Sequence, residues 1–158
     1  MSDPTGVKAD LIPYSTEYRR DVHSWLDSPE TLRAVCRGKE FPPPEDVVDG
    51  WHRKGVAPFI MLSANKPVAY GELWNRPLEL ALEVSHLLVA PAYRGKGYGT
   101  KMLELLVARA ETRRDIAKVM INLFDDDEVA LGCYLKAGFE VLGMSKFTTG
   151  IRLVKLIK

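Results

Sequence analysis

This sequence contains little cysteine and almost no surplus of positive or negative charge. Its two cysteines, Cys36 and Cys133, stand far apart and outside any Cys/His spacing of the zinc type, so we expect reduced thiols and no metal site. The 22 Lys and Arg residues nearly balance 21 Asp and Glu residues, and the net charge of +1 provides no overall attraction to nucleic acid or to an anionic membrane. A membrane-spanning apolar run and a signal-peptide pattern are also lacking. These absences predict a cytoplasmic protein without nucleic-acid or membrane partners.

What the chain does have is enough length and apolar content for one core. It contains 158 residues, of which 46% are hydrophobic and 27% are charged. These values are ordinary for one globular domain, and neither an internal repeat nor a low-complexity segment divides the chain. We therefore expect a single domain over residues 1–158.

The order of apolar patterns predicts an α/β (α+β) fold. Apolar runs predict strands at 7–13, 59–64, 68–74, 80–89, 118–124, 139–143 and 151–157. Helical spacing and cap residues predict helices from about 16 to 26, from Ser28-Pro29 onward, and over 45–54, 97–114 and 128–137. This order places helices on the faces of a mixed sheet.

A glycine-rich turn connects the long strand 80–89 to the helix 97–114. It reads Arg94-Gly95-Lys96-Gly97-Tyr98-Gly99-Thr100. Alternating glycines let consecutive backbone N–H groups converge, and the helix N-terminus, Arg94 and Lys96 add positive charge. The pattern predicts a phosphate or pyrophosphate site, with a tightly packed helix-entry turn as the alternative. The glycine spacing fits neither a P-loop nor the Gly-x-Gly-x-x-Gly dinucleotide fingerprint.

The same turn resembles the signature of the GNAT superfamily of acyl-CoA-dependent N-acyltransferases. The family pattern is Arg/Gln-x-x-Gly-x-Gly/Ala after the fourth strand, and Arg94, Gly97 and Gly99 match it. A second family motif, Asn-x-x-Ala-x-x-x-Tyr-x-x-x-Gly-Phe, follows at the right separation. The residues that match it are Ala130, Tyr134, Gly138 and Phe139, whereas Asp127 replaces the usual Asn. The close resemblance covers residues 80–143.

The resemblance implies a GNAT-like fold with a mixed, mostly antiparallel central sheet. Residues 80–143 would form the acetyl-CoA-binding core, and residues 1–58 would supply the acceptor-side strand and helices. Acetyl-CoA would be the co-substrate, with no metal, and dimers are common enough in the family that a homodimer is one expected assembly. The resemblance places the co-substrate against Leu87, Leu88, Val89, Arg94, Gly95, Lys96, Gly97, Tyr98, Gly99, Thr100, Asp127 and Tyr134.

Acetyl transfer to an amine needs a base for the amine and an acid for the leaving thiolate. The resemblance places the Tyr134 hydroxyl near the sulfur of coenzyme A, so Tyr134 is the predicted acid. Glu83, on the long strand before the loop, is the predicted base. His86 is the second candidate, although strand alternation places it opposite Glu83 unless a bulge intervenes. Asn122 stands where other members carry a base glutamate and cannot accept a proton at neutral pH.

The sequence thus predicts an N-acetyltransferase that moves an acetyl group from acetyl-CoA to a primary amine by direct transfer in a ternary complex. Glu72 and Trp74 are further candidates for the acceptor side, with ordinary strand positions as the alternative. Two other functions stay open: a non-catalytic acyl-CoA-binding or regulatory module, and an acyltransferase for a longer acyl-CoA. Aminoglycosides, polyamines, protein N-termini, lysine side chains and small metabolites all remain open as acceptors.

Overall fold

A computed structural model describes residues 6–123, 128–144 and 150–157 and places the strands in one seven-stranded sheet. The order across the sheet is β1-β2-β3-β4-β5-β7-β6, and only the pair β4–β5 is parallel. The strands are β1 (Asp10–Pro13), β2 (Val56–Ser63), β3 (Lys66–Arg76), β4 (Ala81–Val89), β5 (Lys118–Leu123), β6 (Glu140–Met144) and β7 (Ile151–Leu156). The expected mixed, mostly antiparallel sheet is confirmed.

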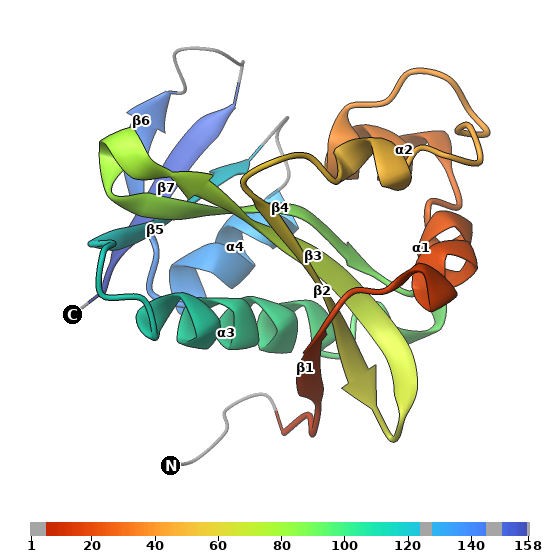
Figure 1. Cartoon of the computed structure of the whole chain (residues 1–158), viewed down its shortest axis with the longest axis horizontal. Helices are drawn as coiled ribbons and strands as arrows, with labels where there is room; N and C mark the ends of the chain where they lie inside the picture. Colours follow the sequence, from red (N-terminus) through yellow and green to blue (C-terminus); the bar gives the residue numbers. More distant parts are fainter. Residues whose placement is uncertain (1–5, 124–127, 145–149, 158) are drawn as a thin grey trace.

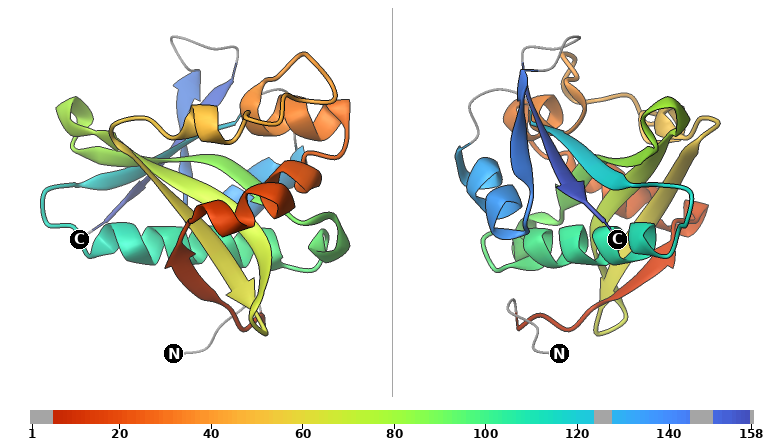
Figure 2. Two further views of the ribbon diagram at one scale, coloured as in Figure 1. Left: turned by 45° about the vertical axis from the view of Figure 1, so that its right-hand side comes forward. Right: turned by 90° about the vertical axis from the view of Figure 1, so that its left-hand side faces the viewer.

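Helices cover both faces of this sheet. The helices α3 (Tyr98–Glu111) and α4 (Glu128–Lys136) lie on one face, and α1 (Arg19–Trp25) and α2 (Pro29–Cys36) lie over the other (Figure 1; Figure 2). Short 3₁₀ turns complete the described elements: η1 (Thr16–Tyr18), η2 (Asp49–Trp51), η3 (Pro77–Glu79) and η4 (Pro91–Tyr93). The two faces therefore bury two separate apolar clusters, one under α3 and α4 and one under α1 and α2.

The helix α3 is the largest apolar contribution to the first cluster. Its buried side chains recur at helical spacing and are Met102, Leu103, Leu106, Val107 and Ala110. On β3, Gly71 lies directly beneath them, because a Cβ there would come within 2.9 Å of Leu106 Cδ1. The missing side chain of Gly71 thus lets α3 lie close to the sheet.

An irregularity in the pairing of β3 with β4 lies where β4 begins to separate from β5. The register moves from Tyr70 opposite Leu88 to Glu72 opposite Ser85, so that Gly71 alone faces both His86 and Leu87. His86 takes a left-handed backbone conformation with φ of 49°. One extra residue opposite a single partner is a β-bulge, which bends its strand. The described pairing of β4 with β5 ends at Val84 opposite Ile121, so the second half of β4 leaves β5.

The sequence-based elements agree with the structure in type and order, with one exception. A helix was expected over residues 45–54, but the structure forms only the single turn η2 there. The segment contains Asp46, Val47, Asp49 and Gly50, all weak helix formers. The burial of Val48 and Trp51 in the second apolar cluster, rather than helix propensity, holds this segment in place.

Arg94 connects the end of β4 to the end of α1 and the residues that follow it. Its Nε donates to the carbonyl oxygen of Val89 at 2.9 Å, and its terminal nitrogens donate to the Trp25 carbonyl oxygen at 2.7 Å and to an Asp27 carboxylate oxygen at 3.0 Å. These bonds fix the direction in which the chain leaves β4, and so help to set the path of the glycine-rich turn that follows.

Replacing Arg94 with Ala should destabilise the protein by about 2 kcal/mol, because the loss of each hydrogen bond costs about 1 kcal/mol and two carbonyl acceptors lose a charged donor. Urea denaturation measures this free energy of unfolding. Arg113 is the matched control, because the described hydrogen bonds of its side chain reach the exposed carboxylate of Asp115, two residues along. Arg113→Ala should cost less than about 1 kcal/mol. Equal losses in the two variants would contradict a connecting role for Arg94.

Candidate active site

A pocket of about 190 Å³ lies where β4 and β5 separate. Its lining combines one helix from each side of the sheet with the edges of both strands. The lining residues are Ala34 and Val35 of α2, Glu83 to Leu87 of β4, Ile121 to Leu123 of β5, and Ala130 and Tyr134 of α4. Because α2 and α4 lie over opposite faces of the sheet, the lining of the pocket comes from both faces.

The glycine-rich turn lies at the end of β4, next to the α4 side of this pocket. Gly95 and Gly97 take left-handed conformations with φ of 73° and 91°, and Gly97 is the N-cap of α3. As a glycine, the N-cap residue has no side chain with which to cap this helix end. The first N–H groups of a helix have no partner within it, so the backbone of Tyr98, Gly99 and Thr100 is suited to donate to an anion. The turn therefore fits the pyrophosphate of coenzyme A.

The residues predicted to contact the co-substrate lie on and around this turn, but the side chains of Arg94 and Leu88 are engaged elsewhere. The side chain of Arg94 is committed to Val89, Trp25 and Asp27, whereas Lys96 is exposed. A contact between Arg94 and phosphate stays a prediction. The side chain of Leu88 is buried among the residues under α1 and α2, so the contact predicted between Leu88 and pantetheine would use its backbone and stays a prediction.

The second motif places Tyr134 on α4, in the pocket lining and against the apolar cluster under α3. Thr100 and Cys133 connect the two helices, with Thr100 Oγ1 and Cys133 Sγ 2.9 Å apart. Asp127, the predicted pantetheine contact, lies outside the described residues. Tyr134 thus lines the pocket between the separated strands β4 and β5.

Glu83 lies in the same pocket with both carboxylate oxygens engaged. Arg76 Nε donates to one oxygen at 2.9 Å, and Asn122 Nδ2 donates to the other at 3.1 Å. Asn122 in turn accepts from Arg152 at 3.2 Å. The side chain of Glu83 is 7% exposed, so its predicted role as the base would require proton uptake on a carboxylate that is nearly buried in an ion pair.

A second buried carboxylate, Glu72, is more central than the sequence indicated. It is fully buried, and three side chains converge on it. Trp74 Nε1 donates to Oε1 at 2.7 Å, His86 Nδ1 lies 2.7 Å from the same oxygen, and the Tyr70 hydroxyl donates to Oε2. His52 Nε2 lies 2.9 Å from the Tyr70 oxygen and extends the network toward the loop after η2.

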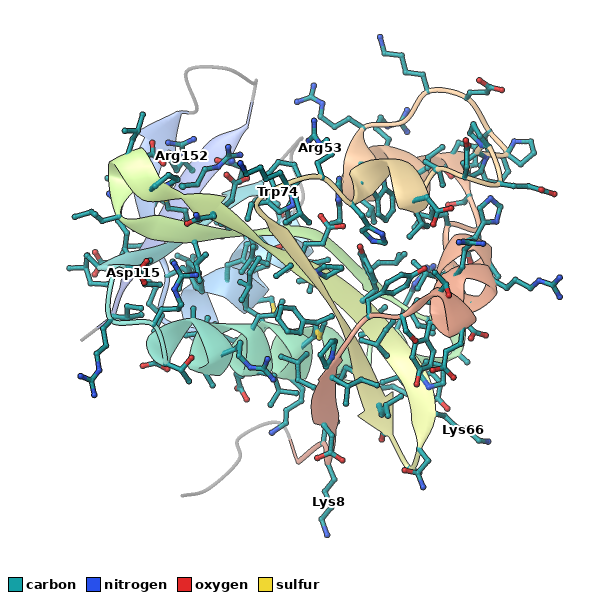
Figure 3. The ribbon with its side chains drawn as sticks, viewed as in Figure 1. Lys8, Arg53, Lys66, Trp74, Asp115 and Arg152 are labelled. Atoms are coloured by element: carbon teal, nitrogen blue, oxygen red, sulfur yellow. The ribbon has the colours of Figure 1, made fainter. Side chains whose placement is uncertain are left out.

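Aromatic rings enclose this network. Trp51 stacks on the His86 ring with a centroid distance of 4.2 Å, and Trp74 meets the His86 ring edge-on at 5.5 Å. Arg53 and Arg76 lie over the Trp74 ring, 5.7 and 5.2 Å from its centroid, and Figure 3 labels Arg53 and Trp74. The alternation of Tyr70, Glu72 and Trp74 along β3 could have revealed the network from the sequence, whereas nothing in the sequence singled out His52.

Two kinds of feature are absent from the described residues. No group of at least three His, Cys, Asp or Glu side chains in this part of the chain is arranged to hold a metal ion. Across residues 6–123, 128–144 and 150–157, no helix has both the length and the apolar character needed to cross a membrane.

Comparison with known proteins gives distant relatives over most of the chain. An N-acetyltransferase 9-like protein of Nematostella vectensis is 22% identical over 151 residues, which covers 86% of this chain and 76% of that protein. An aminoglycoside N(6')-acetyltransferase type 1 of Klebsiella pneumoniae is 26% identical over 102 residues, which covers 58% of this chain and 51% of that protein.

Solved structures share the fold. The aminoglycoside acetyltransferase AAC(6')-Ib, in complex with coenzyme A and kanamycin, superposes with a TM-score of 0.78 at 20% identity, covering 94% of this chain and 95% of that one. The spermidine N-acetyltransferase of Vibrio cholerae, in complex with coenzyme A and spermine, superposes with a TM-score of 0.77 at 16% identity, with the same coverage of both chains.

The sequence model of the acetyltransferase (GNAT) family matches residues 19–139. That span begins at α1 and ends after α4, and so includes the glycine-rich turn, the opened strands and the pocket between them. The chain belongs to the GNAT acetyltransferase family.

Proposed function

We propose that this protein transfers the acetyl group of acetyl-CoA to a primary amine, with both substrates bound at once. The observation that carries the proposal is the pocket at the opening of β4 and β5, because its lining comes from both faces of the sheet. A donor reaching it past α4 and an acceptor reaching it past α2 would meet there. Distant relatives named as aminoglycoside and spermidine acetyltransferases support an amine acceptor.

The donor side would be held mainly by backbone. The N–H groups at the start of α3 bind the pyrophosphate, and Lys96 adds a positive charge beside it. Leu87, Leu88 and Val89 follow the last described pairing with β5, so the β5-facing edge of this stretch is left for the pantetheine amides. Acetyl-CoA supplies the acetyl group as a thioester, activated for attack by a nitrogen.

Tyr134 is the proposed proton donor to the leaving sulfur. A phenol with an ordinary pKa of about 10 protonates a thiolate with a pKa of about 8.5 only when it is well positioned. Its place on α4, in the lining of the pocket, supports this role. The same hydroxyl serves the reaction only as the carbon–sulfur bond breaks, so it contributes to turnover more than to binding.

The proposed function is tested by a screen of primary amines with acetyl-CoA and the full chain, with thiol release as the readout. The panel contains kanamycin, spermidine, butylamine and a peptide with a free N-terminus and one lysine. We expect at least one amine to accelerate thiol release above the slow hydrolysis of acetyl-CoA. Tight binding of coenzyme A without transfer to any amine would instead establish a binding module.

Gly99→Val should lower the affinity for coenzyme A at least tenfold, about 1.4 kcal/mol, because a branched side chain would occupy the approach to the first turn of α3. A Cβ at Gly99 meets Val89 Cγ2 at 3.5 Å, an ordinary contact, so the variant should fold. Gly97 is less informative, because its φ of 91° strains any substituent.

Titration calorimetry with coenzyme A measures the effect of Gly99→Val. Gly50→Val is the control, since a Cβ there has no neighbour within 4 Å and the residue lies in η2, away from the glycine-rich turn. Wild-type affinity in a folded Gly99→Val variant would exclude this turn as the pyrophosphate site.

Tyr134→Phe should lower kcat roughly 10²-fold while the Kd for coenzyme A stays nearly unchanged, because only the proton donor is removed. Steady-state kinetics with the best amine of the panel and calorimetry with coenzyme A separate the two effects. A raised Kd with an unchanged kcat would make Tyr134 a binding residue, with water as the acid.

A further inference from the structure

We infer that His86 is the catalytic base that takes the proton of the acceptor amine, and that the buried carboxylate of Glu72 is the positioning residue that orients it. The inference rests on the proposed function and assigns the proton acceptor that this function needs. It also replaces the simplest expectation from the sequence, in which Glu83 fills that role.

The bulge in β4 is what brings His86 to the acceptor side. Regular alternation would send it to the face covered by α3, opposite Glu83. Because His86 and Leu87 together face Gly71, the alternation is shifted by one residue at this point. Leu87 packs with the cluster under α3, whereas His86 stacks on Trp51 on the other face. Glu83 and His86 therefore line the same pocket.

Hydrogen bonding determines which nitrogen of His86 is free to act. Nδ1 lies 2.7 Å from Glu72 Oε1, and a carboxylate accepts hydrogen bonds. The proton on Nδ1 is thereby favoured, which leaves the lone pair on Nε2. The His86 side chain is 12% exposed and lines the pocket, so Nε2 is the nitrogen that remains for an amine. A histidine oriented by a buried carboxylate is an arrangement that suits proton transfer.

The remaining partners of Glu72 keep its carboxylate an acceptor. Burial and the neighbouring charge of Glu72 raise the pKa of the Tyr70 phenol, so Tyr70 donates its proton to Glu72. The Tyr70 oxygen then accepts from His52 Nε2. Burial lowers the pKa of His52, which keeps that ring neutral near pH 7. Every described donor in the network is therefore directed toward Glu72.

Packing holds the His86 ring in a fixed orientation. Trp51 stacks against it with an interplanar angle of 27°, and Trp74 meets it at 77° while also donating to Glu72. A ring fixed on two sides and bonded at Nδ1 presents Nε2 in one direction. This preorganisation is what an effective base requires, since proton transfer depends on geometry first.

Glu83 differs from His86 in what proton uptake would cost. Arg76 and Asn122 donate to its two oxygens, so a proton on Glu83 would displace one of these donors and leave Arg76 without its counter-charge. A proton on His86 instead strengthens the pair with Glu72, because imidazolium and carboxylate attract. The structure thus gives Glu83 the task of holding the side chains of Arg76 and Asn122 in place.

The proton balance of this assignment closes. An alkylammonium acceptor first gives one proton to His86 Nε2, and His86 later releases it to solvent. The nitrogen–carbon bond then forms as the carbon–sulfur bond breaks. The sulfur gains a proton from Tyr134, and the nitrogen gives its second proton through solvent to the Tyr134 phenolate, which restores the phenol. The net products are the N-acetyl amine, coenzyme A and one proton in solution.

The first test does not require an acceptor amine. Long-range ¹H–¹⁵N NMR of the imidazole nitrogens in the full chain reports the tautomer of His86, with His86→Gln used to assign its signals. We expect the proton on Nδ1 in the wild type, and a shift toward the other tautomer in Glu72→Gln. A proton on Nε2 in the wild type would overturn the inference, since that nitrogen would have no lone pair for the amine.

The second test is the pH dependence of kcat/KM with butylamine, or with the best amine of the panel. His86→Gln should lose activity about 10²-fold at pH 7 and recover partly as the pH approaches the pKa of the amine, about 10.4 for a lysine-like amine. Glu72→Gln should move the acidic limb of the profile. The charged or titratable groups around His86 that set this limb are Glu72, Tyr70, His52, Glu83, Arg76 and Arg53.

His23→Gln is the matched control, because it replaces a histidine of α1 that contacts the Pro43 and Pro44 carbonyl oxygens and takes no part in the network around Glu72. This control should keep kcat/KM within about threefold of the wild type and leave the pH profile unchanged. Wild-type activity in His86→Gln would overturn the inference about His86 but not the proposed function. Each variant must bind coenzyme A like the wild type in calorimetry. If the wild type binds coenzyme A but acetylates no amine, the proposed function fails, and the NMR result still reports the His86–Glu72 pair separately.

Discussion

The bulge that sets His86 and Leu87 against Gly71 is the constraint on which the rest of the site depends. It bends β4 away from β5 beyond Val84, and the space left between the strands becomes the pocket. A side chain at Gly71 would meet Leu106 and Met102 of α3 at 2.9 and 3.2 Å. Glycine, the smallest residue, therefore lies where the bulge and the close approach of α3 coincide. Beyond the bulge, β4 leads into the glycine-rich turn at which α3 begins.

The sheet also separates two kinds of environment. Under α3 and α4 the described contacts are mainly apolar, and the suggested donor contacts come from backbone groups. Over the other face, polar side chains form two hydrogen-bonded sets, one from His52 through Tyr70 and Glu72 to His86 and one from Arg76 through Glu83 and Asn122 to Arg152. Buried polar groups are costly unless they are paired. The pairing explains how Glu72 can be fully buried in the middle of a sheet.

Much of this could be read from the sequence, because its signals are local. The glycine alternation, the motif around Tyr134 and the apolar runs predicted the family and the order of the elements. The face of His86 could not be predicted, since a bulge changes alternation without changing composition. The direction of Arg94 was also hidden, because its partners Trp25 and Asp27 are far away in sequence. The roles of Glu83 and Tyr134 stay predictions.

The contacts of Arg94 have a consequence for how the binding of the two substrates is coupled. Its guanidinium joins the strand end that leads into the glycine-rich turn to the connection between α1 and α2. In the proposed function the two substrates would approach on these two sides, so this one side chain would connect the two proposed binding sites. If donor binding tightens this connection, it changes the affinity for the acceptor, and thermodynamic linkage makes the acceptor change the donor's affinity by the same factor. Cooperativity between the two substrates is thus a property that a single arginine could impose.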